Sequence, residues 1–300
     1  MLKNYKGHLL AFLGIVFWGI AGPVAKFLYY KGFSSFLIIQ TRSTFSFILL
    51  FLIFIVFRRD LIVIPLKDAL KLMLLGVIGL AGPNFFYYTS IKYVTVATGI
   101  MIQYTTPFMV MIYSILMKQE KYHHLKLIFL SIAFIACFFT ISGGDINYFT
   151  TNVLGVTLAI AAALTWAFYN IYHKYIQKKY NSWTELFYIL LGATLLWIII
   201  NPNLFVELSS FSFQSNMILF FFAMLSVLIP LTFYNIGLRN LKATQATSIG
   251  LLEPVMVVIF AYIFVNETMS LIQIISGIIV LLSIYLLESY RQKIDYIEKK

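Results

Sequence analysis

Residues 233–268 read FYNIGLRNLKATQATSIGLLEPVMVVIFAYIFVNET, which is the end of one apolar run, a short polar turn and a second apolar run. The second run carries Glu253-Pro254 in its middle and Glu267 at its end. An ionised side chain at the centre of a lipid-facing helix costs about 2.5–3.5 kcal/mol on insertion scales. The carboxylate therefore indicates a helix that borders a cavity inside a membrane protein.

The same pattern occurs earlier in the chain. Residues 87–120 read YYTSIKYVTVATGIMIQYTTPFMVMIYSILMKQE and align without a gap to residues 234–267, at an offset of 147 positions. Pro107 then meets Pro254, and Glu120 meets Glu267. A second alignment, at an offset of 148, pairs Trp18 with Trp166. The chain therefore contains an internal repeat of about half its length.

The composition is that of a membrane protein. Of the 300 residues, 61% are hydrophobic and 11% are charged, whereas soluble domains are about 45–50% apolar and about 25% charged. The net charge of +11 raises the question of nucleic acid, but the basic residues are scattered among short loops, so we expect no nucleic-acid partner. The single Cys137 lies in an apolar run and has no intrachain partner for a disulfide.

Ten apolar runs are long enough to cross about 30 Å of hydrocarbon at 1.5 Å per residue. We expect helices over residues 8–30, 34–57, 69–90, 94–117, 124–142, 153–176, 184–201, 216–238, 243–265 and 271–289. Ser34 and Ser182 are expected to cap helix starts, with Glu185 completing a capping box after Ser182. The predicted fold is an all-α integral membrane protein, and the first run is expected to be a retained helix rather than a cleaved signal peptide.

Lys and Arg are distributed unequally between the two ends of these runs. With the N-terminus in the cytoplasm, 18 of the 22 basic residues lie at cytoplasmic loop ends, and only Lys31 and Lys92 lie at the other ends. Positive residues accumulate on the cytoplasmic side of membrane proteins. We therefore expect a multi-pass protein of the cell membrane with both termini in the cytoplasm.

Each half of the repeat has five runs, and an odd number gives the two halves opposite directions across the membrane. The expected halves are 1–146 and 147–300, the second ending in a short basic tail. Inverted repeats of this kind allow secondary transporters to expose one midplane site to either side in turn, the process called alternating access.

The repeated segments carry a resemblance to a known family. The segment LLEPVMVVIFAYIFVNE, its weaker copy ending in TTPFMVMIYSILMKQE, and the runs that contain Trp18 and Trp166 look like the EamA-type transporters of the drug/metabolite transporter superfamily. The resemblance covers residues 7–290. It implies ten helices in two inverted five-helix repeats, cytoplasmic termini, and movement of small metabolites, often amino acids, usually outward.

The chain departs from symmetry at one position: Thr106-Pro107 stands where the second half has Glu253-Pro254. Any role of this carboxylate therefore belongs to one half only. Buried inside the bundle, it can bind and release a proton or hold an ammonium group, and we expect proton coupling to be its role. The open alternative is a carboxylate that only hydrogen-bonds to a neighbouring helix.

The expected cavity is lined from the helices that carry polar and paired aromatic residues. Prolines at matching depths are expected to kink two of these helices beside the cavity, and Arg42 can bind a substrate carboxylate or extend to the interface. The candidate substrate-binding residues are Trp18, Arg42, Asn84, Tyr88, Gln103, Trp166, Asn170, Asn235 and Glu253, with kinks at Pro107 and Pro254. Runs 124–142 and 271–289 are almost purely aliphatic and should lie at the periphery.

The leading interpretation is a secondary transporter that exports small metabolites such as amino acids. No enzyme activity, cofactor or metal is expected: His123-His124 are adjacent and point to different faces of a helix, and no GxxxxGK[ST] loop is present. The alternatives are a lipid-handling or scaffold protein of the same fold and, less favoured, a membrane-embedded enzyme. The sequence leaves the substrate, the coupling ion and the oligomeric state open.

Overall fold

The computed structural model describes residues 2–177, 179–265 and 268–297. Ten segments of this part are long and apolar enough to span a membrane, which confirms the expected number. In chain order they are α1 (Leu2–Tyr30); α2 (Ser35–Phe57); α3, η2 and α4 (Leu66–Leu75, Gly76–Ala81 and Gly82–Ser90); α5 and α6 (Val96–Gln103 and Thr106–Leu116); α7 (His124–Ser142); α8 (Val153–Ile176); α9 (Ser182–Ile200); α11, η4 and α12 (Phe213–Ala223, Met224–Leu228 and Ile229–Asn240); α13, η5 and α14 (Ala243–Ile249, Gly250–Leu252 and Glu253–Val265); and α15 (Leu271–Ile297). The short helices η1 (Arg59–Leu61), η3 (Ile146–Tyr148) and α10 (Leu204–Ser209) lie in connections.

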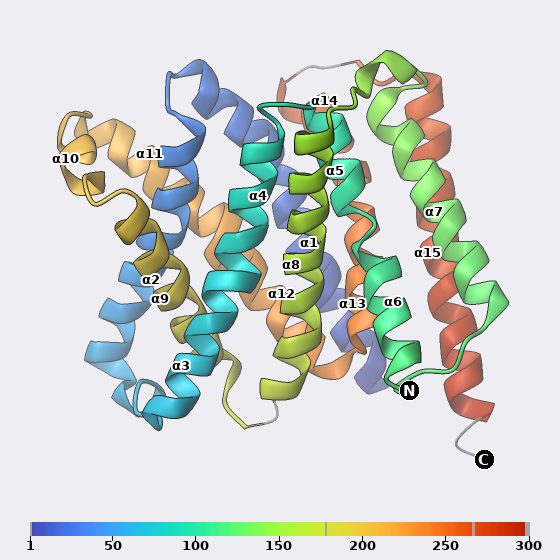
Figure 1. The fold of residues 1–300 in the computed structure, drawn as a ribbon, viewed down its shortest axis with the longest axis horizontal. Coiled ribbons are helices and arrows are strands. Elements are labelled where there is room, and N and C mark those ends of the chain that lie inside the picture. The colour runs from blue at the N-terminus through green and yellow to red at the C-terminus, as the bar shows by residue number, and fades with distance from the viewer. Residues whose placement is uncertain (1, 178, 266–267, 298–300) are drawn as a thin grey trace.

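The spans form a helical bundle with both chain ends on one face (Figure 1). At one edge α7 lies beside α15, and these two helices pack closely along their length. In the middle, α1 packs against α12 and α14, and α8 packs against α4, α5 and α6. Spans from the two halves of the chain therefore interleave at the centre. The division of the chain at residues 146 and 147 stays a prediction.

The fourth and ninth spans are interrupted near their prolines. Helix α5 ends at Gln103 and α6 begins at Thr106, one residue before Pro107. In the second half, the 3-10 turn η5 separates α13 from α14, whose second residue is Pro254. A proline has no N–H to donate and its ring crowds the preceding turn, so a helix restarts more easily at proline than it continues through it.

The third and eighth spans contain a feature that the sequence analysis did not anticipate. Each has a segment of π-helix, η2 and η4, at positions 148 residues apart. Each segment comes shortly before a proline, Pro83 or Pro230. The wider turn of a π-helix gives room for the proline ring against the preceding carbonyls. These turns bring carbonyl groups to the centre of the bundle.

Two helix caps were predicted from the sequence, and one of these predictions is wrong. Ser34 caps α2, since its hydroxyl accepts from the Leu37 N–H. The cap of α9 is Asn181, whose side chain accepts from the Trp183 N–H, so Ser182 is the first residue inside the helix. Glu185 is consequently not part of a capping box: its carboxylate lies 3.1 Å from His173 Nε2, and both side chains are fully buried. Glu267, expected at a helix end, lies outside the described residues.

Candidate functional site

A cavity of about 200 Å³ lies at the centre of the bundle. Its walls come from the first, second, third, fourth, sixth, eighth and ninth spans. Seven of the predicted binding residues line it, together with one of the predicted kink residues: Trp18, Arg42, Asn84, Tyr88, Gln103, Trp166, Glu253 and Pro107. The sequence pattern thus identified most of a wall that assembles residues from both halves of the chain.

A larger space of about 780 Å³ adjoins this cavity. The two spaces share seven lining residues, among them Trp18, Arg42 and Glu253. The rim of the larger space includes Thr95 and Gln273. These two residues lie near the first residues of α5 and α15, on the face of the bundle opposite the chain termini. We call this larger space the vestibule. It connects the central cavity with the face opposite the termini.

Aromatic rings form one side of the central cavity. Trp18 meets Trp166 edge to face, with 5.8 Å between ring centroids. Tyr234 lies 5.3 Å from Trp18 and 5.8 Å from Trp166. Stacking of Tyr169 on Trp166, at 4.9 Å, supports this wall from behind. Rings in this arrangement offer a flat apolar surface or a negative π-face for a cation.

Two opposite charges border the cavity. Arg42, Tyr104 and Glu253 line both the cavity and the vestibule. Arg42 Nη2 donates to the Ser226 carbonyl at 2.9 Å, which lies in the π-helical segment η4. Its Nε is buried and has no hydrogen-bond partner within the described residues. The guanidinium is therefore held against η4 at the edge of the cavity.

Two amides on the wall differ in their bonding. Asn84 Nδ2 donates to the Leu80 carbonyl at 2.7 Å, four residues earlier on the same span. The Gln103 side chain, at the break between α5 and α6, makes no hydrogen bond within the described part of the chain, although its backbone carbonyl accepts from the Thr106 hydroxyl at 2.7 Å. The Gln103 amide is thus the one with both donors and acceptor available to a bound molecule.

Asn170 and Asn235 do not line the cavity. Both side chains are fully buried behind the aromatic wall. Tyr234 donates to Asn170 Oδ1 at 2.6 Å, and Tyr169 donates to Asn235 Oδ1 at 2.7 Å. The two amides hold the hydroxyl groups of the wall. Contact with a substrate at these two positions stays a prediction.

Sequence reasoning left out two tyrosines of the wall, Tyr104 and Tyr234. Tyr234 is the repeat partner of Tyr87 at an offset of 147, so the alignment held a signal for it. Tyr104 follows Gln103 directly. It had no such signal because only the break after α5 turns neighbouring residues toward the same cavity.

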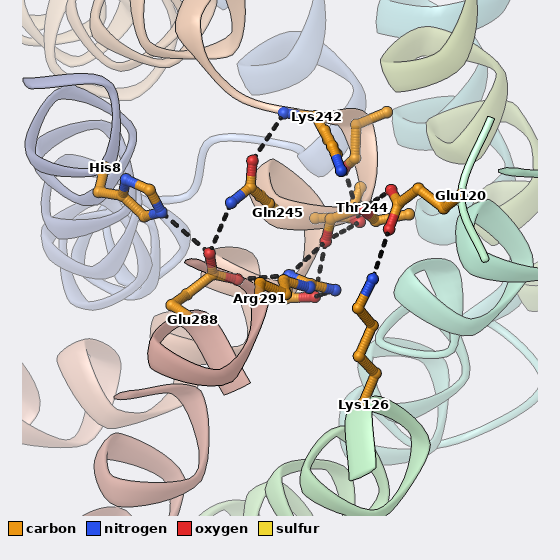
Figure 2. A network of polar contacts seen from close by, with 11 residues as sticks. His8, Glu120, Lys126, Lys242, Thr244, Gln245, Glu288 and Arg291 are labelled. Carbon is orange, nitrogen blue, oxygen red and sulfur yellow. Dashed lines mark hydrogen bonds and ion pairs between the residues drawn. The ribbon is translucent and has the colours of Figure 1, made fainter. Parts of the chain in front are cut away.

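A network of polar contacts joins helices near the face of the termini (Figure 2). Glu288 on α15 is its centre: its carboxylate accepts from His8 Nε2 at 2.9 Å and from Gln245 Nε2 at 2.9 Å, and it pairs with Arg291. Arg291 also reaches the Thr244 carbonyl at 3.4 Å. The network thus joins α1, α13 and α15.

The network continues to α6 and α7. The Thr244 hydroxyl donates to Glu120, whose carboxylate also lies 3.2 Å from Lys126 Nζ. Glu288, Arg291 and Lys126 are all at least nine-tenths buried. We call this set, His8, Glu120, Lys126, Thr244, Gln245, Glu288 and Arg291, the closure. It contains Glu120, the partner of Glu267 in the sequence repeat.

Comparison with known proteins gives a consistent result. The EamA-like transporter family profile matches residues 5–142 and 153–289. The uncharacterized inner membrane transporter YicL of Salmonella typhimurium is 22% identical over 298 residues, which cover 96% of this chain and 96% of that protein. An uncharacterized transporter of Archaeoglobus fulgidus is 24% identical over 284 residues, 94% of this chain and 98% of its own length.

The uncharacterized transporter YyaM of Bacillus subtilis is 22% identical over 225 residues, 73% of this chain and 72% of that protein. A solved structure described only as the crystal structure of a protein superposes with a TM-score of 0.74 at 16% identity, covering 94% of this chain and 96% of that chain. At that identity the likeness extends to the fold alone.

Proposed function

Because the chain belongs to the EamA-like transporter family, we propose that it is a secondary active transporter that exports small metabolites such as amino acids. The observation that carries this proposal is the central cavity, which is bordered by Trp18 and Trp166 from equivalent positions of the repeat and opens through the vestibule toward one face. A site built from two inverted halves is what alternating access requires. The names of the relatives favour a transporter over an enzyme.

The chemistry of the wall favours a substrate with both charges. Arg42 is placed for a carboxylate, which guanidinium groups bind with paired hydrogen bonds. Glu253 and the π-faces of Trp18 and Trp166 suit an ammonium group. The cavity volume of about 200 Å³ matches a molecule of amino-acid size better than an oligopeptide. We therefore propose zwitterionic amino acids and related amines as the substrate class.

The orientation follows from the basic residues. The face of the termini carries 18 of the 22 Lys and Arg residues at its loop ends, so we propose that this face is cytoplasmic. The structure then corresponds to an outward-facing state, with the vestibule open to the exterior and the closure of Figure 2 sealing the cytoplasmic side.

We further propose that Glu253 couples substrate export to proton entry. It is the carboxylate on the wall of the cavity and the vestibule, and Arg42 and Tyr104 line the same two spaces. If a proton and the substrate ammonium group compete for this carboxylate, each outward step of substrate is followed by an inward step of a proton. In such an exchange the proton gradient drives substrate export, and protons do not cross the membrane without substrate moving the other way.

The test is transport by the purified protein in liposomes. Vesicles loaded with a panel of radiolabelled amino acids and amines are diluted into label-free buffer. The dilution is done with and without a more acidic external buffer, so that the proton gradient is directed inward. We expect saturable efflux of at least one zwitterionic substrate, accelerated several-fold by the gradient. Arg42→Gln should reduce efflux at least about tenfold, the loss expected of a charge-assisted bond worth about 1.5–3 kcal/mol, whereas Arg58→Gln, an exposed arginine outside the cavity, should not. If no substrate leaves the vesicles faster than it leaves protein-free vesicles, the proposal is contradicted.

One observation favours the lipid-handling alternative. A groove of about 560 Å³, walled mainly by apolar residues such as Phe12, Leu252 and Ile284, lies between α1 and α15. The same vesicles, made with a fluorescent phospholipid whose outer-leaflet fraction is quenched chemically, distinguish the two functions. Protein-dependent exposure of the inner-leaflet lipid, together with no efflux of any small solute, would favour lipid movement.

A further inference from the structure

The carbonyl group of Ser226 lies in the eighth span, four residues before a proline. In an α-helix this carbonyl would accept from the backbone N–H four residues later, but Pro230 has none. The N–H just before the proline, that of Ile229, donates instead to the Met224 carbonyl in the π-helical segment η4. The proline therefore leaves the Ser226 carbonyl without its α-helical donor at the wall of the central cavity.

Arg42 on α2 uses this carbonyl. Its Nη2 donates to the Ser226 oxygen at 2.9 Å, and its Cζ lies 5.6 Å from the centre of the Phe222 ring. Phe222 and Ser226 are four residues apart, on the same side of the eighth span. The Ser226 hydroxyl does not compete for the carbonyl, since it donates to the Phe222 carbonyl at 2.6 Å. The eighth span thus presents a carbonyl and a π-face to one guanidinium.

The equivalent place in the other half of the repeat has no arginine. Pro83 corresponds to Pro230 at the offset of 147, and Arg42 corresponds to Ile189, which is fully buried. Helix α9, which carries Ile189, packs on η2 as α2 packs on η4. A π-helical segment before a proline therefore does not need an arginine for packing. The guanidinium at η4 is better explained by its place at the cavity, which Arg42 lines together with Glu253.

We propose that Pro230 and Phe222 are positioning residues that make the central site selective for substrates with a carboxylate. This role rests on the proposed function, in which Arg42 binds the substrate carboxylate. A guanidinium forms two parallel hydrogen bonds to a carboxylate only in the right orientation, and a free arginine side chain has many rotamers to lose. The Ser226 carbonyl and the Phe222 ring fix this orientation before the substrate arrives, which removes most of the ordering cost from binding.

Binding of matched pairs of ligands tests this role. Leucine is compared with isopentylamine, and phenylalanine with phenethylamine, because each amine is its amino acid without the carboxylate. Dissociation constants are obtained from the rise of the unfolding midpoint with ligand concentration, on the purified protein in detergent. The unchanged protein should bind at least one amino acid about tenfold more tightly than its amine, as expected for a charge-assisted bond. Arg42→Gln should abolish this preference.

Pro230→Ala supplies an N–H for the Ser226 carbonyl. Closure of the wide turn to an ordinary α-helix should then direct that carbonyl along the helix and away from Arg42. The preference should fall about two- to tenfold, the ordering cost of one long side chain, through weaker binding of the amino acid and with an unchanged dissociation constant for the amine. Phe222→Leu should act in the same direction without changing the backbone. A role limited to folding would weaken the binding of both members of each pair.

Pro83→Ala is the matched control, because it restores the corresponding N–H in the third span, which packs on α9 and not on α2. Whatever its effect on stability, the preference for the carboxylate should remain. Equal binding of both members of every pair by the unchanged protein would contradict the proposed role of Arg42 itself. If Arg42→Gln removes the preference but Pro230→Ala and Phe222→Leu keep it, the positioning role is overturned while the role of Arg42 stands. The same conclusion follows if Pro83→Ala lowers the preference as much as Pro230→Ala does.

Discussion

Individual charged residues occupy two very different environments in this molecule. Glu253 and Arg42 border the central cavity, where water and a ligand have access to them. His173 and Glu185 are fully buried, and His173 Nδ1 and Glu185 Oε1 have no hydrogen-bond partner within the described residues. The first pair is suited to reversible binding. The second pair is a fixed contact between α8 and α9, and the two pairs should respond differently to substitution.

At Glu253 the informative change is Glu253→Gln, which keeps the shape of the side chain and removes its charge. If this carboxylate couples protons to transport, the variant should lose gradient-driven net efflux from liposomes while it retains substrate exchange in the absence of a pH gradient. Both rates are measured on the same vesicle preparation. Full gradient-driven efflux by a well-expressed variant would leave Glu253 with a structural role beside Pro254.

At the buried pair, His173→Leu should lower the stability by about 3–5 kcal/mol, because it leaves the fully buried Glu185 carboxyl without its partner. The double variant His173→Leu with Glu185→Leu should regain most of that loss, since two packed leucines replace a buried pair without leaving a charge behind. Thermal or denaturant unfolding in detergent measures both. A double variant less stable than the single one would show that Glu185 is held by contacts other than His173.

At the scale of the helices, the closest approach joins the third span to α9. A Cβ built on Gly76 would lie 2.0 Å from the Ile189 carbonyl oxygen, and one on Gly192 would lie 2.2 Å from that of Met73. In both cases the obstacle is backbone, which cannot move without separating the helices. The two glycines therefore set the distance between α9 and the third span where α3 passes into η2.

Gly76→Ala should consequently destabilise the protein by at least about 2 kcal/mol, in the range of overpacked cores, and lower the yield of folded protein. Gly22→Ala is the matched control, because the added Cβ would meet Val257 at an ordinary 3.5 Å. Fluorescence-detected size exclusion after heating compares the two variants. Equal stability of both would mean that η2 and α9 can separate at little cost.

The sequence predicted the helices better than their interruptions. Hydrophobic length alone located ten spans, because each must cover the same thickness of hydrocarbon. Pro107 and Pro254 marked the two breaks, since proline acts on the turn that contains it. The π-helical segments before Pro83 and Pro230 were missed because a proline can be relieved by a kink, a break or a wide turn, and local sequence does not distinguish among these.

For the candidate site as well, local sequence patterns predicted some features, and features that depend on distant packing were missed. Repeat symmetry and helical spacing placed Trp18, Trp166 and Glu253 on one cavity wall. They also placed Asn170 and Asn235 there, because both are polar residues on helices that were expected to line the cavity. The structure instead turns these amides toward Tyr234 and Tyr169. Which side of a buried helix meets the cavity depends on the packing of its neighbours, and that information is spread over the whole chain.

At the scale of the whole molecule, the polar contacts between helices differ between the two ends of the bundle. Toward the termini, the closure holds buried ion pairs that include Glu288 with Arg291 and Glu120 with Lys126. At the opposite face, the connection between α5 and the segment before α8 is made by hydroxyl groups, such as Thr98 Oγ1 to the Thr150 carbonyl at 3.0 Å. Under the proposed alternating access, we expect the charged network to bias the resting protein toward the state that is open away from the termini.

This asymmetry predicts the effect of removing the central charge of the closure. A cysteine in place of Gln103, on the cavity wall, should react with a small membrane-impermeant thiol reagent from the face opposite the termini, while the buried Cys137 stays unreactive. Glu288→Gln leaves Arg291 without its ion-pair partner on α15 and weakens the bonds to His8 and Gln245. In the Glu288→Gln protein, labelling of the introduced cysteine from the face of the termini should rise at least about fivefold. A free-energy shift of about 1 kcal/mol toward the state that is open to the termini produces a change of this size.

Asp60→Asn provides the control for this experiment. It removes an exposed carboxylate that pairs with Arg58 on the same face, outside the closure, and labelling should stay one-sided. Right-side-out and inside-out vesicles give the two directions of access and identify the cytoplasmic face at the same time. If Glu288→Gln remains labelled from one side only, the ion pairs do not set the resting state. The bias would then have to come from the apolar packing of α1 against α12 and α14, which the substitution leaves in place.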